Sequence, residues 1–370
     1  VEYIYDDERD EFYFLEVNTR LQVEHGVTEA VFDVDLVAWM VMLAGGEQPP
    51  LDADYQSRGH AMEVRIYAED ALKDFQPSPG ELTEVSFPDD IRLDGWVDTG
   101  TQVSPHYDPM LAKVIVHGDD RPAALKKMQD ALAATRLSGI ATNLDYLRRI
   151  LIDPNVVEGK VSTRYLESFQ YTPTAFEVVE PGTYTTVQDY PGRAGYWDIG
   201  VPPSGPMDDY AFRLGNRIVG NHASAAGLET TLVGPSLKFH SDTVVALTGA
   251  ACDATLDGKP VEMWQPVAVK AGQTLATGKA SSGCRTYIAV RNGIDVPDYL
   301  GSKSTFVLGQ FGGHGGRTLR KGDVLSLCQP QLAGCPTPAP DHEPAPAPEA
   351  MIPDYPQQWE IKVLYGPHGA

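Results

Sequence analysis

Glu16-Val-Asn-Thr-Arg-Leu-Gln-Val-Glu-His25 lies in a run of residues that alternates like a strand, with polar side chains at every second position from Glu16 to Arg20. Side chains two residues apart in a strand point to the same side. The alternation therefore predicts a strand with Glu16, Asn18 and Arg20 on one face. The opposite face carries three apolar side chains that can pack: Tyr13, Leu15 and Val17. We expect the polar face to line a cleft that holds a functional site.

Glu2 lies in a second β-rich run, Val1–Tyr5, and the polar segment Asp6–Asp10 between the two runs predicts a hairpin loop. A loop centred near Arg9 would place Glu2 opposite Glu16, with the two carboxylates roughly 5 Å apart and repelling each other. A hard divalent cation between them removes that repulsion, and Mg2+ prefers carboxylate and amide oxygens. For any one of these acidic residues taken alone, a half-buried strand with a solvated charged face is the more common explanation of the pattern.

The full motif Glu-x-Asn-x-Arg-x-Gln-Val-Glu-His, beginning at Glu16, resembles the active-site strand of the biotin carboxylase branch of the ATP-grasp enzymes. The resemblance implies that three residues hold Mg2+ or Mn2+ ions bridging the phosphates of ATP: Glu2, Glu16 and Asn18. It implies that Arg20 steadies the biotin enolate or carboxyphosphate, and that Glu24 takes the proton from bicarbonate. It also implies cofactor-binding roles for Gln22 and Val23.

These residue types suit that chemistry on independent grounds. A base that activates bicarbonate need only be an exposed or slightly perturbed carboxylate. Arginine offers a planar, permanently charged fork that matches carboxylate and phosphate oxygens, whereas lysine does not.

A second motif, Arg58-Gly-His-Ala-Met-Glu-Val-Arg-Ile-Tyr-Ala-Glu-Asp70, alternates in the same way. Glu63 and Arg65 share one face, and the other face is apolar, with Met62, Val64 and Ile66. The motif resembles the next biotin carboxylase signature, which implies that Arg65 is the second arginine over bicarbonate and the ureido group of biotin. A surface salt bridge from Glu63 explains the local pattern as well. Further motifs follow in the family's order, so the resemblance extends from about Val1 to Ser168.

The 370-residue chain is too long for one ordinary core and carries a formal charge of −22. That charge argues against nucleic acid or an anionic membrane as a partner, because both require a basic face.

The longest apolar run, Leu36–Ala44, is far shorter than the ~20 residues that span a bilayer, and Gly45 follows it as a helix stop. We expect a soluble cytoplasmic protein. Its four cysteines lack zinc-finger spacing and are expected to be reduced thiols: Cys252, Cys284, Cys328 and Cys335.

The beginning of the chain favours a fragment. There is no initiator methionine, and the first residues fall inside what the resemblance makes the middle of an ATP-grasp domain. The family's glycine-rich lid, its nucleotide-clamping lysine and its preceding Rossmann-like domain have no counterpart here. We therefore expect the isolated chain to be inactive, and each catalytic role to belong to the parent enzyme.

Composition divides the chain into regions. Residues 1–170 form the biotin carboxylase part, with helices predicted after Asp120 and from Asn143 to Ile150. Pro and Thr residues make 171–181 a linker. Residues 182–370 contain short β-branched runs separated by Gly and Pro, typical of an all-β barrel or sandwich with one helix near 208–219. A Pro-rich spacer at 329–356 is expected to be extended or disordered.

The β-rich region has motifs of its own, including Gln188-Asp-Tyr-Pro-Gly-Arg193 and Gly200-Val-Pro-Pro-Ser-Gly-Pro-Met-Asp208. Together they resemble the carboxyltransferase domain of urea carboxylase, which is shared with allophanate hydrolase subunit 2 and KipA-like proteins. The resemblance implies two cyclophilin-like β halves, of which the second is mostly missing. The expected fold is thus multidomain α+β: the C-terminal part of an ATP-grasp biotin carboxylase, followed by a truncated cyclophilin-like carboxyltransferase domain.

A biotin carboxylase part fused to this carboxyltransferase type is the layout of urea carboxylase. The resemblance implies ATP- and bicarbonate-dependent carboxylation of biotin, which is carried on a biotinyl domain of the parent chain, and transfer of the carboxyl group to urea to give allophanate. A neutral substrate needs matched hydrogen-bond donors and acceptors more than charge. Five residues are candidates for that second site, although turn or cap roles explain each of them too: Tyr190, Arg193, Ser204, Asp208 and His368.

Alternative functions remain open. Guanidine carboxylase, in the same family, would require an acidic group for its cationic substrate. From a different class, the β-rich region could be a non-catalytic KipA-like module or a component of 5-oxoproline hydrolysis, but those proteins normally lack a fused biotin carboxylase. The resemblance also allows a homodimer through the biotin carboxylase domain.

Overall fold

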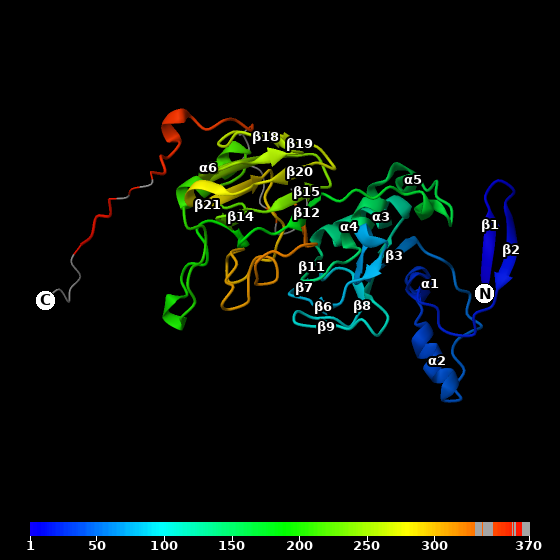
Figure 1. Ribbon diagram of the computed structural model, residues 1–370. Helices are drawn as coiled ribbons and strands as arrows, with labels where there is room; N and C mark the ends of the chain where they lie inside the picture. Colours follow the sequence, from blue (N-terminus) through cyan, green and yellow to red (C-terminus); the bar gives the residue numbers. More distant parts are fainter. Residues whose placement is uncertain (330–334, 336–342, 357, 359, 365–370) are drawn as a thin grey trace. The chain divides into compact units, whose positions relative to one another are not determined.

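The computed structural model describes residues 1–329, 335, 343–356, 358 and 360–364 (Figure 1). The chain divides into two compact units, Val1–Phe169 and Gln170–Ala370. Every helix in the described part of the chain is too short or too polar to cross a membrane.

The first unit begins with an antiparallel hairpin of β1 (Glu2–Asp6) and β2 (Glu11–Glu16). Its register pairs Glu2 with Glu16, which confirms that the two carboxylates face each other. The prediction of one strand through Arg20 is wrong, because the ladder ends at Glu16 and both Asn18 and Arg20 lie beyond it. The expected apolar packing is wrong too. Every residue of β2 is exposed, since a two-stranded hairpin buries little of either face.

Two short helices follow the hairpin. α1 (His25–Phe32) contains Glu29, a buried carboxylate that accepts a hydrogen bond from Leu36 N at 2.6 Å. α2 (Leu36–Ala44) is capped by Asp35, whose Oδ1 accepts from Ala38 N at 2.7 Å. The helix ends at Gly45, as the sequence predicts. None of the residues of α2 is buried.

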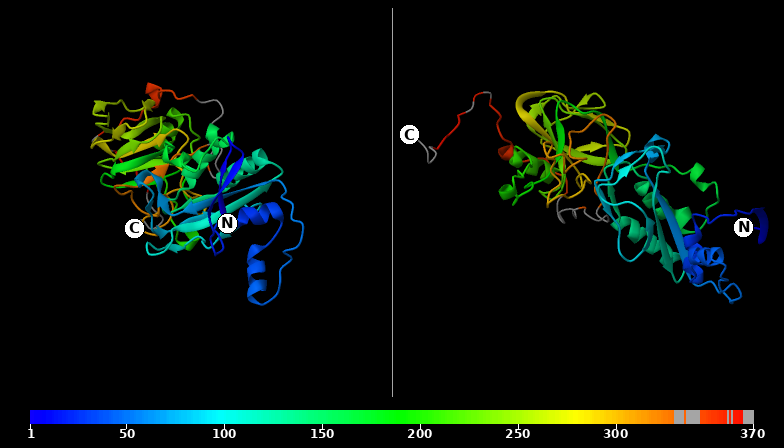
Figure 2. Two further views of the ribbon diagram at one scale, coloured as in Figure 1. Left: turned by 90° about the vertical axis from the view of Figure 1, so that its right-hand side faces the viewer. Right: turned by 90° about the horizontal axis from the view of Figure 1, so that it is seen from below.

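The core of the first unit lies between a small sheet and two helices (Figures 1 and 2). β10 (Met110–Gly118) is the central strand, between β3 (His60–Tyr67) and β8 (Arg92–Gly95). α3 (Arg121–Ala134), capped by Asp120, packs on the sheet together with α4 (Leu144–Ile152), and both predicted helices are confirmed. The remaining elements are short: β4 (Glu69–Asp70), η1 (Ala71–Lys73), β5 (Gln76–Pro77), β6 (Gly80–Glu81), β7 (Glu84–Ser86), β9 (Gln102–Val103), β11 (Arg136–Ser138), α5 (Pro154–Val157) and η2 (Tyr165–Glu167).

The second unit is built from two antiparallel sheets around one apolar core (Figure 2, right). The six-stranded sheet has the order β18-β17-β20-β15-β12-β22, with strands Lys259–Pro260, Thr255–Leu256, Thr274–Ala276, Ser236–Phe239, Ala175–Glu180 and Val324–Ser326. The five-stranded sheet has the order β13-β14-β21-β16-β19, with strands Thr185–Gln188, Gly227–Thr231, Ala280–Val290, Thr243–Cys252 and Val267–Val269. Both sheets contribute fully buried side chains to this core, such as Phe176 and Leu228, so the expected β-rich texture is confirmed.

α6 (Asp209–Ile218) packs on β16 and β21 of the five-stranded sheet, and it is the helix expected near 208–219. A short η3 (Trp197–Ile199) precedes it. α6 presents Phe212 to Tyr287 in an edge-to-face contact, with ring centroids 5.8 Å apart. This packing places Asp208, the residue that caps α6, next to Tyr287 on β21.

Two details differ from expectation. β12 occupies most of the predicted linker 171–181, because Phe176 and Val178 alternate into the core while β15 and β22 pair on either side. The predicted Pro-rich spacer 329–356 falls partly outside the described residues. Its described end is docked rather than free: Ala345 N donates to Ile218 O at 3.0 Å, and η4 (Glu349–Met351) follows.

Candidate active site

At the open end of the hairpin, an acidic group contains the first three candidate residues. Asn18 Nδ2 donates to Glu2 Oε1 at 2.7 Å and to Glu16 Oε1 at 3.1 Å. The Gln22 side-chain amide also donates to Glu2 Oε1. The structure thus brings together four candidates: Glu2 on β1, Glu16 on β2, and Asn18 and Gln22 in the segment after β2. We call Glu2, Glu16, Asn18 and Gln22 the hairpin group.

The hairpin group offers the ligand chemistry of a magnesium site. Glu2 and Glu16 are paired in register, and amide N–H groups are the partners that the structure gives both carboxylates. Two carboxylates this close repel each other unless a cation lies near them. Because carboxylate and amide oxygens are hard ligands, the residues present fit Mg2+ or Mn2+.

An ion pair joins the two motifs of the first unit. Arg65 Nη2 lies 2.9 Å from Glu24 Oε2, although the two residues are 41 positions apart. Glu24 precedes the first turn of α1, and Arg65 lies on β3. Gln22 Nε2 donates to Glu24 Oε1 at 3.4 Å, which connects this ion pair to the hairpin group. Both partners remain partly exposed, so a small anion can reach them.

Two other candidates of the first motif behave differently. Arg20 is exposed, and its Nη1 donates to the neighbouring Leu21 O at 3.2 Å. The structure therefore does not place Arg20 in the Glu24–Arg65 pair. Val23 takes part through its main chain: its carbonyl accepts a hydrogen bond from Lys113 Nζ at 2.8 Å.

Lys113 is a functional candidate that the sequence reasoning missed, and Glu63 is one that it named only as a partner in a surface salt bridge. Lys113 lies within the apolar strand β10, and its side chain is 8% exposed and 3.2 Å from Asp94. Glu63 lies on β3 with a 6% exposed side chain, and its carboxylate is 3.8 Å from Arg65 Nε. Burial raises the pKa of Glu63 despite the positive charges of Lys113 and Arg65. A lysine inside an apolar strand was the available signal, because lysine is rarely buried without a partner.

In the second unit, the two candidate motifs pack against each other. Gly205 N donates to Gln188 Oε1 at 3.0 Å, and Arg193 N donates to Pro203 O. Ser204, in this contact, has a positive φ of 54°, a conformation that is strained for serine. Tyr190 is half-buried, with the Arg213 guanidinium 4.7 Å from its ring centroid.

Arg193 is fully buried, contrary to the expectation of a substrate contact. Its Nε donates to Tyr299 O at 2.8 Å and its Nη2 to Ser304 O at 2.9 Å, while the guanidinium lies 4.9 Å from the Phe311 ring centroid. Burial lowers the pKa of Arg193. Arg193 therefore fixes the loop at 299–311 from inside, and it has no access to a substrate.

Asp208 has both carboxylate oxygens engaged. Oδ1 caps α6 by accepting from Ala211 N at 3.0 Å, and Oδ2 accepts from Tyr355 OH at 2.6 Å. Its main-chain N–H donates to Tyr287 OH at 2.7 Å, and that hydroxyl donates to Glu229 Oε2 at 2.9 Å. Burial raises the pKa of both tyrosines, so both hydroxyls stay protonated. The remaining candidate, His368, lies outside the described residues.

Family models match three segments of the chain. Residues 1–51 match the ATP-binding domain of the carbamoyl-phosphate synthase L chain, and 63–168 match the biotin carboxylase C-terminal domain. Residues 199–370 match the carboxyltransferase domain, subdomains A and B.

Known proteins resemble the chain along its whole length. Urea amidolyases of Lachancea kluyveri and Saccharomyces cerevisiae are 54% and 52% identical to it, and the match covers 100% of the chain and 20% of each relative. Crystal structures of the urea amidolyase and the urea carboxylase of Kluyveromyces lactis each match with a TM-score of 0.93 and 53% identity, over 22% and 33% of those chains. The chain thus spans between a fifth and a third of the length of these relatives.

Replacement of Glu63 by glutamine should change how stability depends on pH. The folded-state pKa of Glu63 is raised above its ordinary value of 4.5, so the unfolded chain loses this proton first as the pH rises. Stability linked to Glu63 is therefore fully present below pH 4.5 and is lost as the pH rises through the higher folded-state pKa. Glutamine has no such loss, so thermal unfolding at several pH values should show E63Q gaining on the parent above pH 4.5.

The matched control is Glu8→Gln, which alters an exposed carboxylate in the hairpin loop of the same unit. Its stability difference from the parent should not follow the Glu63 pattern. The prediction is contradicted if the stability difference between E63Q and the parent stays constant or reverses as the pH rises. In that case Lys113 and Arg65 would fully offset the effect of burial on the pKa of Glu63.

Proposed function

The chain is a homologue of the urea amidolyases and urea carboxylases along its whole length, and from this premise we propose that it is part of a biotin-dependent urea carboxylase. The proposed reaction uses ATP and bicarbonate to carboxylate biotin, and then transfers the carboxyl group to urea to form allophanate. The first unit takes part in the first step, and the second unit in the transfer.

The contact between Glu24 and Arg65 is the observation that carries the first step. It joins the two motifs that resemble the biotin carboxylase signatures. A hydrogen bond from Gln22 to Glu24 connects it to the hairpin group. A partly exposed carboxylate next to a guanidinium can accept a proton from bicarbonate while the guanidinium binds the anion. Lys113 supports this arrangement, because it holds the Val23 carbonyl one residue before Glu24.

The hairpin group is proposed to hold the metal ions of Mg·ATP. Glu2 and Glu16 would supply carboxylate oxygens and Asn18 an amide oxygen, while Gln22 orients Glu2. Bound Mg·ATP supplies the phosphoryl group that drives the step. Arg20 is exposed and bonded only to a neighbouring carbonyl among the contacts described, so it can turn toward the bound anion at low cost.

The second unit is proposed to bind the carboxylated biotin and urea. Tyr190 and Ser204 are the candidates that remain free to face a small molecule, since Arg193 is buried and Asp208 is bonded on both oxygens. Asp208 then acts by positioning Tyr355 and the start of α6. We retain His368 as a candidate from the sequence.

The wider setting of the protein is also proposed rather than observed. On the resemblance to biotin carboxylases, we propose a homodimer through that part of the protein and delivery of biotin by a biotinyl carrier domain of the same enzyme. We propose a cytoplasmic protein, and the charge of −22 argues against nucleic acid or an anionic membrane as its partner.

Glu16→Gln in the complete enzyme tests the metal role. Loss of one carboxylate should weaken Mg2+-supported, bicarbonate-dependent ATP hydrolysis by about 100-fold or more, the size typical for removal of a charge contact in such a site. Glu11→Gln is the matched control, because Glu11 lies at the other end of the same exposed strand. Unchanged ATP hydrolysis in the Glu16 variant, or an equal loss in the control, would contradict the proposal.

The choice of urea is tested by comparing kcat/KM for urea and for guanidine on the complete enzyme. Urea is neutral and requires only paired hydrogen bonds, whereas guanidinium requires a desolvated carboxylate. Both oxygens of Asp208 are already engaged, so this carboxylate is not available to pair with guanidinium. A preference for guanidine of tenfold or more, about 1.4 kcal/mol in transition-state binding, would overturn the choice of substrate and leave the biotin carboxylase step intact.

A further inference from the structure

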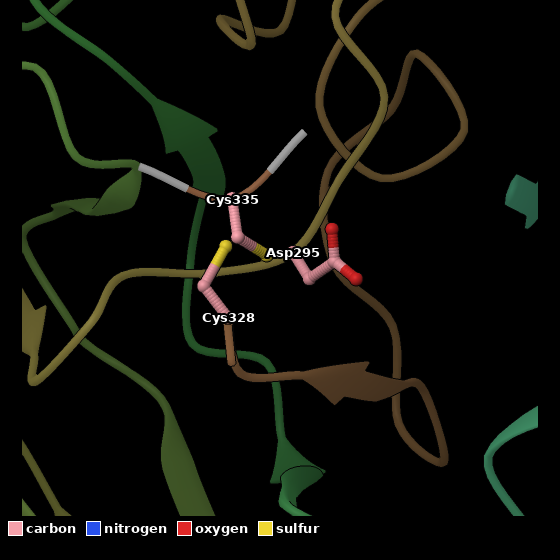
Figure 3. A group of neighbouring side chains, drawn as sticks. All are labelled: Asp295, Cys328 and Cys335. Atoms are coloured by element: carbon pink, nitrogen blue, oxygen red, sulfur yellow. The ribbon is translucent and has the colours of Figure 1, made fainter. Parts of the chain in front are cut away.

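Cys328, Cys335 and Asp295 gather their side chains at one point of the second unit (Figure 3). Their two sulfur atoms and a carboxylate oxygen all lie within 4.8 Å of one another. These are metal-binding groups from three separate positions in the chain. The residues take no part in the two sites described above.

The backbone holds two of the three groups in fixed positions. Cys328 N donates to Gly293 O at 2.9 Å, and Asp295 N donates to Ser326 O at 2.8 Å. Between these bonds, Ile294 and Leu327 form an antiparallel bridge and are fully or almost fully buried. Asp295 and Cys328 therefore project from a short, rigid ladder at the edge of the core. Cys335 reaches the same point seven positions after Cys328.

We propose that Cys328, Cys335 and Asp295 form a binding site for a zinc-like divalent cation. In tetrahedral zinc sites the metal–sulfur distance is about 2.3 Å and the metal–oxygen distance about 2.1 Å, so neighbouring ligand atoms lie roughly 3.5–3.8 Å apart. The three observed ligand atoms all lie within 4.8 Å of one another, which is close to that spacing. Among the described residues the group has three protein ligands, so water completes the fourth position.

The ligand types select the metal. Two thiolates favour zinc and related soft ions over Mg2+, which takes oxygen ligands and belongs to the hairpin group instead. Each thiol releases its proton to solvent as the metal binds. Cys328 is 1% exposed and Cys335 is partly buried, so the bound ion would be shielded on one side. The ion would fasten Cys335 to the ladder and stabilise the folded chain by mass action.

Metal titration of the full chain tests the site. The protein is purified with a reductant, stripped with a chelator and titrated with Zn2+, and Co2+ then serves as the spectroscopic probe. We expect one ion per chain at the thiolate site, reported by a thiolate-to-cobalt charge-transfer band that the oxygen ligands of the hairpin group cannot give. Cys335→Ser and Asp295→Asn should each weaken Zn2+ binding by about tenfold or more, because even outer-shell partners cost about 10- to 100-fold.

Matched controls separate binding from folding. Cys284→Ser alters an exposed thiol of the same unit and should keep the parental affinity and cobalt band. Circular dichroism identifies any variant that does not fold. Asp295→Asn keeps the shape of the side chain, so it remains informative if Cys328→Ser disrupts the interior.

Three results would overturn the proposal. The first is the absence of stoichiometric Zn2+ binding by the reduced parent chain. The second is an equal loss of affinity in Cys284→Ser. The third is a Cys328–Cys335 disulfide, found by mass spectrometry in chain purified without reductant, together with no metal binding after reduction, which would make the two cysteines a redox pair.

Discussion

The antiparallel pairing of β3 with β10 is the constraint on which the candidate site of the first unit depends. Its register sets Arg65 directly opposite Lys113. Two positive charges in opposed positions repel each other in a sheet. Here each cation forms an ion pair with its own carboxylate: Arg65 pairs with Glu24, and Lys113 pairs with Asp94. The carboxylates offset this repulsion, and Arg65 remains partly exposed beside Glu24 while Lys113 is buried beneath the Val23 carbonyl.

Local pattern and loop length predicted the parts of this site that lie near one another in the sequence. The position of the hairpin loop was enough to place Glu2 opposite Glu16, because an antiparallel register follows from the turn. The helix after Asp120 followed from its capping residue, and the end of α2 followed from Gly45. The family resemblance placed Glu24 and Arg65 in one site, and the structure gives their contact directly.

Other features depended on contacts that no local pattern contains. Alternation beyond Glu16 looked like strand, but the ladder between β1 and β2 stops at the pair of Glu2 and Glu16, and Asn18 and Arg20 lie outside it. Arg193 was predicted to contact the substrate, but its side chain is enclosed by the loop at 299–311, whose carbonyl groups accept its hydrogen bonds. The cap role of Asp208 was one of two local readings, and its bond to Tyr355 spans 147 positions. No sequence spacing predicts the contact of Cys328 with Asp295, because the bridge between Ile294 and Leu327 brings them together.

The central claim is that the hairpin group and the Glu24–Arg65 pair form one Mg·ATP and bicarbonate site. Its most direct test is a crystal structure of the complete enzyme with Mn2+ and a non-hydrolysable ATP analogue, in which anomalous scattering locates the metal. We predict Mn2+ at ligand distance, about 2.2 Å, from carboxylate oxygens of both Glu2 and Glu16, with the Arg65 guanidinium facing the same cavity. Manganese bound on the triphosphate with neither Glu2 nor Glu16 among its ligands would contradict the account.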